Sequence, residues 1–300
     1  MMVDLRKLCP YIGGAIDQFT PPLNFELAGT KFEFVMDDGY DYILDFLDKD
    51  TLEWHWAGDA PKRAKYWCEK GDDTTYLVSF EHAGAAPRAN HTFVIDRENN
   101  LVTRIIAKLG TNPKDEYLIT PEYEFGVIRA EGQDIKPYPR HGFTGDLRGT
   151  VVQWAYGSEM ATVHVYYCSN FYRITYPRDP AFSEEAKKMN EMFNNILKDL
   201  PSSDEPTRYI KIKDGLYLFS LTESNGERIL GAKMGFRSNT MCFLQNYKRE
   251  YLVGRSFGTS TTPEGDTHTH LMFGAYGKLI DPTDDEGLQK MLRDPNPYIV

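Results

Sequence analysis

The chain has 300 residues and a formal net charge of −10, from 44 acidic and 34 basic side chains. An acidic chain without a clustered Lys/Arg stripe repels phosphate backbones, so nucleic acid is not an expected partner. No apolar run approaches the roughly 18 residues of a membrane span, and the first residues lack the apolar core of a signal peptide. We therefore expect a cytoplasmic protein with no membrane partner.

The four cysteines are widely spaced and form no Cys-x-x-Cys pair. They are Cys9, Cys68, Cys168 and Cys242. This spacing favours reduced thiols packed as small apolar groups over a zinc site or a disulfide framework.

The first half of the chain consists of short predicted strands. Residues 29–48, GTKFEFVMDDGYDYILDFLD, alternate apolar and polar side chains on both sides of Asp-Asp-Gly, which is the pattern of a hairpin. Further aromatic and β-branched runs follow at intervals of roughly ten residues, the spacing of an antiparallel barrel or sandwich. We expect residues 1–145 to form one β-barrel.

The second half repeats this order. The segment GTVVQWAYGSEMATVHVYY at 149–167 matches the first hairpin, and YLFSLTESNG at 217–226 matches YLVSFEHAG at 76–84. The offset between the copies grows along the chain, so the second copy contains an insertion. The predicted fold is all-β: two tandem calycin/lipocalin-like antiparallel β-barrels, the second over 146–300 with one inserted α-helix.

The insertion predicts an amphipathic helix over residues 182–200. Ser183 is a candidate N-cap, and Glu184 and Glu185 suit the first turn of a helix. Apolar side chains recur at helical spacing: Met189, Met192, Phe193, Ile196 and Leu197. This stripe is expected to cover one barrel or the seam between the two; a lid over a ligand-binding mouth is the alternative.

Residues that face a barrel interior decide what it binds, and here the two copies differ. The second copy has Trp154, Tyr156, Arg173 and Glu223. The first copy has Phe34, Met36, His55 and His82 at the matching positions. Ordinary core packing is the expected role of the first copy's histidines, His91 included, although His55 and His82 are candidates to face each other across the first barrel.

The second-copy residues suit proton transfer on a small organic acid. An arginine inside a barrel needs an anionic partner, and its planar fork binds a carboxylate well. Tyr156 can donate a hydrogen bond to the same group, and a desolvated Glu223 can exchange protons. Tyr156, Arg173 and Glu223 are therefore the predicted catalytic residues, with no cofactor. For each residue alone, an exterior arginine or a core aromatic is the ordinary alternative.

The same motifs resemble those of the phenolic acid decarboxylases, cofactor-free calycin-type barrels. They are WAY at 154–156, FYRI at 171–174 and SLTES at 220–224. The resemblance implies that the glutamate helps to protonate a side-chain alkene while tyrosine and arginine hold the acid, and that a quinone-methide-like intermediate then loses carbon dioxide. Trp154 replaces the first of the family's two tyrosines; its indole can donate a hydrogen bond but cannot ionise.

The two-barrel layout, over nearly the whole chain, resembles the molybdenum cofactor biosynthesis protein F (MoaF) family. On this interpretation the second barrel is a lyase or isomerase for a small aromatic or unsaturated carboxylic acid, and the first barrel is structural or accessory. The expected substrate-binding residues are Trp154, Tyr172, Thr222, His268 and His270.

Two other functions stay open. An aromatic-lined barrel can be a non-enzymatic binder of a small ligand. In GDTHTHLMFGAYG at 265–277, Asp266, His268 and His270 share a strand face and could hold zinc or iron with His164 as a third ligand. Hydrogen-bonded or surface histidines are the favoured interpretation, so no metal is expected. Apart from a small organic acid, a second copy of the chain in a homodimer is the one partner left open.

Overall fold

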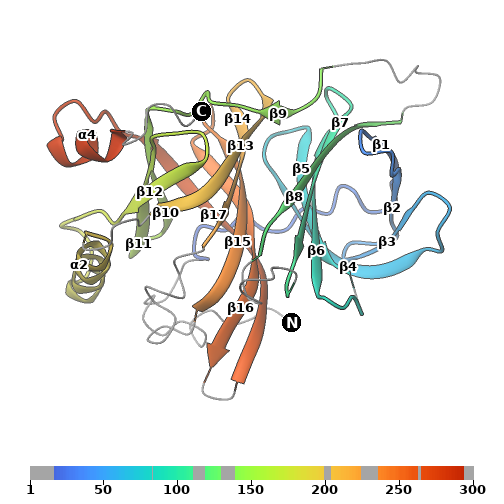
Figure 1. Cartoon of the computed structure of the whole chain (residues 1–300), viewed down its shortest axis with the longest axis horizontal. Helices are drawn as coiled ribbons and strands as arrows, with labels where there is room; N and C mark the ends of the chain where they lie inside the picture. The colour runs from blue at the N-terminus through green and yellow to red at the C-terminus, as the bar shows by residue number, and fades with distance from the viewer. Residues whose placement is uncertain are drawn as a thin grey trace. The chain divides into compact units, whose positions relative to one another are not determined.

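The computed structural model describes residues 17–82, 84–110, 119–129, 139–198, 204–223, 236–262 and 265–293. These residues form two compact units (Figure 1). The first-barrel unit contains Pro21–Gly142 and Lys211–Asp214. The second-barrel unit contains the described residues before Pro21, Phe143–Ile210 and those from Gly215 onward.

The first barrel is a closed antiparallel meander of eight strands. Its strands are β1 (Lys31–Met36), β2 (Tyr42–Phe46), β3 (Thr51–Trp56), β4 (Lys62–Lys70), β5 (Thr75–Glu81), β6 (Ala89–Asp96), β7 (Leu101–Lys108) and β8 (Glu122–Ile128). Each strand pairs with the next, and β8 closes the barrel on β1, where Val35 lies opposite Val127. The predicted hairpin at 29–48 is β1 and β2; its turn places Gly39 at a φ of 84°, a conformation that glycine adopts without strain.

The second barrel repeats this meander. Its strands are β10 (Thr150–Gly157), β11 (Met160–Tyr166), β12 (Phe171–Thr175), β13 (Glu205–Lys213), β14 (Leu216–Thr222), β15 (Phe236–Asn246), β16 (Tyr251–Thr262) and β17 (Gly265–Leu279). Pairing of β10 with β17 and of β12 with β13 closes the ring, and the short β9 (Gly142–Phe143) adds to β13. The predicted tandem of two antiparallel barrels is therefore confirmed.

Alternate residues of each strand point into the barrel interior, because successive side chains of a strand lie on opposite faces. The large interior side chains of the first barrel include Phe34, Tyr42, Trp54, Phe80, Phe93 and Val102. Those of the second barrel include Trp154, Tyr156, Tyr172, Phe219, Leu221 and Phe273. On each of these strands, the residues two apart from an interior residue also point into the barrel, and the residues between them point outward.

Trp154 fits the second interior because a glycine faces it. Gly277 of β17 pairs with Trp154 of β10. A Cβ atom built on Gly277 would lie 2.3 Å from the indole ring. The glycine thus provides the volume that this fully buried indole occupies.

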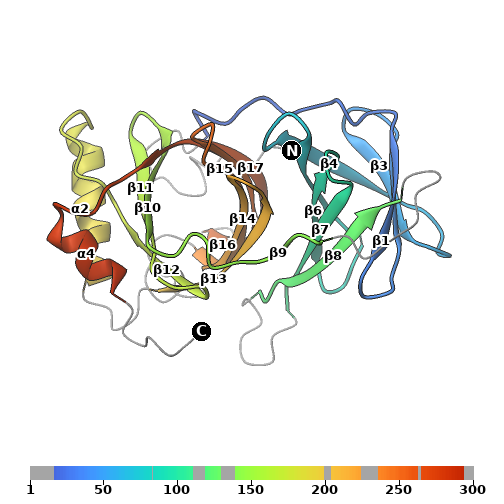
Figure 2. The ribbon, with the colours of Figure 1, turned by 90° about the horizontal axis from the view of Figure 1, so that it is seen from above.

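Helix α2 (Glu184–Lys198) is the inserted helix and lies between β12 and β13. The Ser183 hydroxyl accepts a hydrogen bond from the Ala186 amide at 3.2 Å, which confirms Ser183 as the N-cap. Ala186 packs against Ala161 on the outward face of β11, and Phe193 stacks on Tyr176 with ring centroids 4.8 Å apart. The helix therefore covers the outside of the second barrel (Figure 2). Met192, placed in the predicted apolar stripe, is 42% exposed instead.

A second helix, α4 (Glu286–Leu292), follows the last strand and has no counterpart among the predicted elements. Its Leu288 packs against Val151, Val163 and Val165 on the outward faces of β10 and β11. Neither helix in the described part of the chain has the length and apolar character needed to cross a membrane.

Residues just before Pro21 join the second barrel rather than the first. The Phe19 amide donates to the Tyr156 carbonyl at 3.0 Å, and the Phe19 ring lies 5.5 Å from that of Tyr276. The Thr20 hydroxyl accepts from the Gly274 amide at 3.0 Å. The described segment before the first barrel thus runs along β10 and β17.

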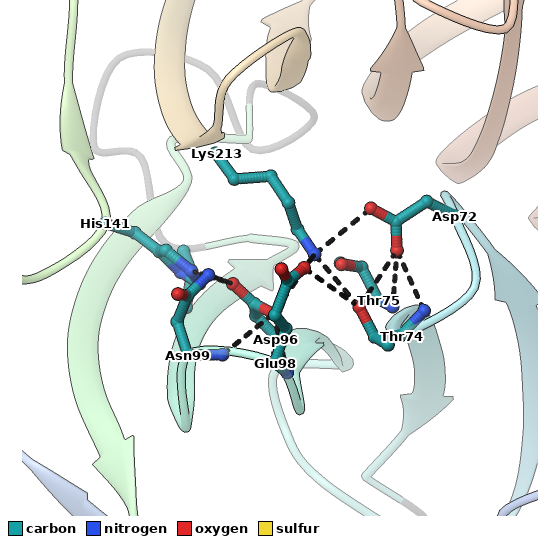
Figure 3. Close-up of polar contacts among 9 residues, drawn as sticks. Asp72, Thr74, Thr75, Asp96, Glu98, Asn99, His141 and Lys213 are labelled. Carbon is teal, nitrogen blue, oxygen red and sulfur yellow. Dashed lines mark hydrogen bonds and ion pairs between the residues drawn. The ribbon is translucent and has the colours of Figure 1, made fainter.

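The first-barrel unit also holds a charge cluster around Lys213, in which Asp96 is fully buried (Figure 3). The Lys213 ammonium pairs with Asp72 at 3.1 Å, with Asp96 at 3.3 Å and with Glu98 at 2.8 Å. Burial alone would raise the pKa of Asp96, but the His141 ring 3.6 Å away, a hydrogen bond from Asn99 and the charge of Lys213 outweigh it and lower that pKa to about 2. The cluster fixes residues 211–214 within this unit.

Candidate functional site

Strand parity separates the eight predicted site residues into two groups. Four point into the second-barrel interior: Trp154, Tyr156, Tyr172 and Glu223. The other four lie on outward strand faces: Arg173, Thr222, His268 and His270. The interior group makes up the candidate site described here.

Glu223 directly follows β14 and continues the inward parity of Phe219 and Leu221. The residue is half-buried, and its amide donates to the Asn239 carbonyl at 2.9 Å. Burial raises the pKa of the Glu223 carboxyl to about 7, and a hydrogen bond from the Asn239 side chain offsets only part of that rise. The protonated and charged forms of Glu223 are therefore both populated near neutral pH.

The Asn239 side chain is oriented by two hydroxyl groups. Its Oδ1 accepts from Thr269 Oγ1 at 3.1 Å and from Ser256 Oγ at 3.5 Å. With Oδ1 occupied, the amide nitrogen is the group left to donate to Glu223. Thus β15, β16 and β17 together position one hydrogen-bond donor at the carboxyl group.

Tyr156 and Tyr172 are neutral phenols in this interior. Burial raises the pKa of both hydroxyls, and the negative charge of Glu223 raises each further. A phenol that stays protonated is a hydrogen-bond donor at neutral pH. The two tyrosines can therefore donate to an anionic group bound near Glu223.

A hydrogen-bonded chain lies deeper in the same barrel. Tyr247 donates to Gln245 Oε1 at 3.0 Å, and Gln245 Nε2 donates to the Tyr166 hydroxyl at 2.8 Å. The Tyr166 proton is then directed to His164 Nδ1, 3.1 Å away. Burial lowers the pKa of His164 to about 3, so this imidazole is neutral. The indole Nε1 of Trp154 donates to the same Tyr166 hydroxyl at 3.5 Å, so Trp154 is part of this hydrogen-bonded network.

Arg173 lies outside the barrel because Tyr172 takes the inward position on β12. Its Nε donates to Asp204 Oδ1 at 2.9 Å, and its Nη1 donates to the carbonyls of Met291 and Arg293. The guanidinium also stacks over the Tyr167 ring at 3.8 Å. Arg173 therefore caps the end of α4 and does not share an interior with Glu223, contrary to the expectation from the sequence.

The histidines of β17 are also placed away from the interior. His268 Nδ1 lies 3.4 Å from Thr259 Oγ1, and the His270 ring meets Phe257 edge-on at 6.2 Å. The side chain of Asp266 is outside the described residues. Among the residues that the structure describes, no group of three or more His, Cys, Asp or Glu side chains is arranged to hold a metal ion.

In the first barrel the two histidines expected to face each other are on opposite faces of the wall. His82 points inward, with its ring 4.7 Å from that of Trp54, whereas His55 follows Trp54 and points outward. His91 is also inward and 4.8 Å from Trp54. The first barrel thus has two interior histidines, at positions 82 and 91.

Sequence reasoning missed several polar interior residues. Asn239 and Thr269 belong to no recognisable sequence motif, because the hydrogen bonds that connect them to Glu223 join strands that are distant in sequence. Arg104 of β7 did carry a signal: it shares its parity with the apolar Val102 and Ile106 in LVTRIIAK. A charged residue at an apolar-parity position indicates an interior charge, as the structure bears out.

Two closed eight-stranded meander barrels in tandem, each with an aromatic interior, define an all-β double-barrel protein. Residues 11–111 match the family model of the MoaF N-terminal domain, a range that contains β1 to β7. This part of the chain is therefore similar to the MoaF N-terminal domain. No curated protein matches the chain.

Proposed function

We propose that the second barrel is a cofactor-independent acid–base site for a small aromatic or unsaturated carboxylic acid, with Glu223 as the proton-transferring group. The observation that carries the proposal is a half-buried carboxyl in an aromatic interior with a pKa of about 7. A general acid or base works best when its pKa lies near the operating pH. A carboxylic acid with an ordinary pKa would be almost fully ionised there.

The tyrosines take the substrate-holding role expected of Arg173. Tyr156 and Tyr172 keep their protons, so both can donate to the substrate carboxylate. The flat rings of the interior, among them Phe219 and Phe273, suit an aromatic or conjugated body. The site thus combines one proton carrier with two fixed donors.

Decarboxylation of a 4-hydroxycinnamate-like acid is the reaction class that these groups support. Protonated Glu223 gives its proton to the alkene carbon that bears the carboxylate, while the substrate phenol releases its own proton to solvent, and a quinone methide results. The bond to the carboxylate carbon then breaks, its electron pair forms the vinyl double bond, and carbon dioxide leaves. The ring electrons return to the phenolate oxygen, which takes up a proton from solvent. Glu223 recovers a proton from solvent, which its partial exposure allows.

A non-enzymatic binding protein is the second candidate, and the position of Arg173 favours it. A lyase site for a carboxylate usually gains from a fixed cation, whereas the described side chains around Glu223 are tyrosine, asparagine and hydroxyl groups. A binder of a neutral or weakly acidic ligand needs no such cation. Turnover separates the two candidates.

The test is turnover of a panel of hydroxycinnamates, followed by loss of substrate absorbance and by carbon dioxide release. The proposal expects wild-type turnover and a fall of roughly 10²-fold or more in Glu223→Gln, which keeps the shape but not the proton exchange. His82→Gln, at the matching position of the first barrel, is the control and should keep full activity. Binding of the acids without turnover would favour the second candidate.

A further inference from the structure

Arg104 is a buried arginine inside the first barrel. It lies on β7 with the inward parity of Val102 and is only 2% exposed. Its guanidinium carbon sits 4.1 Å above the Tyr42 ring. An interior cation of this kind is costly unless its donors are satisfied.

The partners of Arg104 satisfy only one of its three nitrogens. Nη2 contacts Glu124 and lies 3.6 Å from Asp38. Nε and Nη1 are buried without a hydrogen-bond partner among the described residues. An arginine kept only for an internal ion pair would turn its fork to the carboxylate, as paired arginines usually do. Here the N–H groups of two nitrogens are left for an acceptor from outside the chain.

The surroundings of Arg104 are aromatic. The Tyr42 hydroxyl lies 3.4 Å from His91 Nδ1, and the Tyr42 ring is 5.2 Å from that of Trp56. Trp54 is fully buried, and its indole N–H has no partner among the described residues. These rings form a flat apolar surface beside a cation, the combination that takes a planar organic anion.

A second cation lies at the same end of the barrel. The Lys62 ammonium sits 5.0 Å from the Trp54 ring and 4.9 Å from the Trp56 ring. No described carboxylate lies within ion-pair distance of Lys62, whereas the neighbouring Arg63 pairs with Glu53 on the outer face. Burial holds the pKa of His91 well below its usual range, and the charges of Arg104, His82, Lys108 and Lys62 lower it further. Two cations, Arg104 and Lys62, therefore lie beside the aromatic rings of this part of the interior.

We propose that the first barrel, whose strands β1 to β7 lie in the range that matches the MoaF N-terminal domain, binds a small planar organic carboxylate. Its carboxylate accepts hydrogen bonds from Nε and Nη1 of Arg104 and faces the Lys62 ammonium, and its ring lies against Trp56 and His82. Lys62, Trp56 and His82 are half-buried, so this end of the barrel is the side of entry. The site is separate from Glu223 and does not depend on the function proposed for the second barrel.

The experiment is isothermal titration of the full-length protein with benzoate and, in parallel, with its neutral analogue methyl benzoate; 4-hydroxycinnamate is a second acid. The wild type is expected to bind the acids, and the ester at least about 10-fold more weakly, because a hydrogen bond to a charged group is lost. Arg104→Met should weaken acid binding by roughly 10- to 100-fold. Lys62→Met should weaken it by several fold.

Two variants serve as controls. Arg63→Met removes an outward cation next to Lys62, and Glu223→Gln alters the second barrel; both should leave first-barrel binding unchanged. Since Arg104→Met leaves Glu124 without its partner, Arg104→Met/Glu124→Gln and Lys62→Met carry the test if the single variant does not fold. The proposal is overturned if neither acid binds the wild type, if acid and ester bind alike, or if the first-barrel variants bind as the wild type does.

Discussion

Replacing Glu223 by Gln tests the central physical premise, a desolvated interior carboxyl, without knowledge of the substrate. Burial raises the pKa of Glu223 from 4.5 to about 7 in the folded chain. A group that binds its proton more tightly when folded favours the folded state at low pH. This contribution is complete below about pH 4.5 and is lost as pH rises through about 7.

The size of the effect follows from the shift. Each pKa unit corresponds to about 1.4 kcal/mol, so the shift sets an upper limit of about 3 kcal/mol above pH 7. Because Glu223 is half-buried, solvent screening reduces this, and we expect about 1–2 kcal/mol. Glutamine never ionises, so Glu223→Gln should become more stable than the wild type as pH rises.

The assay is urea unfolding of the wild type and Glu223→Gln at pH 4, 6 and 8. The two proteins should have similar free energies of unfolding at pH 4, and the variant should be the more stable at pH 8. Glu185→Gln, on the exposed surface of α2, is the matched control: the same substitution outside the barrel should not reproduce the stability gain of Glu223→Gln. Equal stability of wild type and Glu223→Gln at all three pH values, or a less stable variant at pH 8, would refute the reasoning.

Three further predictions follow from the other polar and packing contacts. Arg173→Met removes the cap of α4 and should lower the free energy of unfolding in urea by about 1–3 kcal/mol, with turnover per folded molecule unchanged; a loss of turnover at full stability would return Arg173 to the site. The depressed pKa of Asp96 contributes about 2 kcal/mol that is lost as pH falls from about 4 to about 2, and acid titration of Lys213→Met should show a smaller loss than the wild type; identical acid profiles would contradict this. Gly277→Ala forces a methyl group against Trp154 and should lower the free energy of unfolding by about 1–3 kcal/mol, whereas a neutral change would show that β17 yields easily.

The repeat in the sequence predicted the architecture, because each copy carries its own hairpin and its own strand order. The inserted helix was predicted from its N-cap and from the growing offset between the copies. The start of the second-barrel unit was not: Phe19 and Thr20 contact β10 and β17, which lie far away in sequence, and no local pattern encodes such pairing.

The structure agrees with only part of the expected grouping of side chains in the second barrel. Glu223, Tyr156 and Tyr172 fall in one interior, but Arg173 does not, because one step along a strand reverses the face of a side chain. The alternation of Tyr172 and Ile174 in β12, continued by Tyr176 just after the strand, already favours the tyrosine face as the inward one. Arg104 was not predicted because all the motifs used to select candidate residues lie in the second copy.

The pH dependence of 4-hydroxycinnamate turnover by the wild type and Glu223→Gln is the most direct test of Glu223 as the proton donor. Wild-type turnover should fall as pH rises, with an apparent pKa near 7, because the protonated form of Glu223 gives the proton. Turnover by the variant should be lower by roughly 10²-fold or more. Absence of turnover in the wild type, or full turnover with an unchanged pH profile in Glu223→Gln, would contradict this role of Glu223.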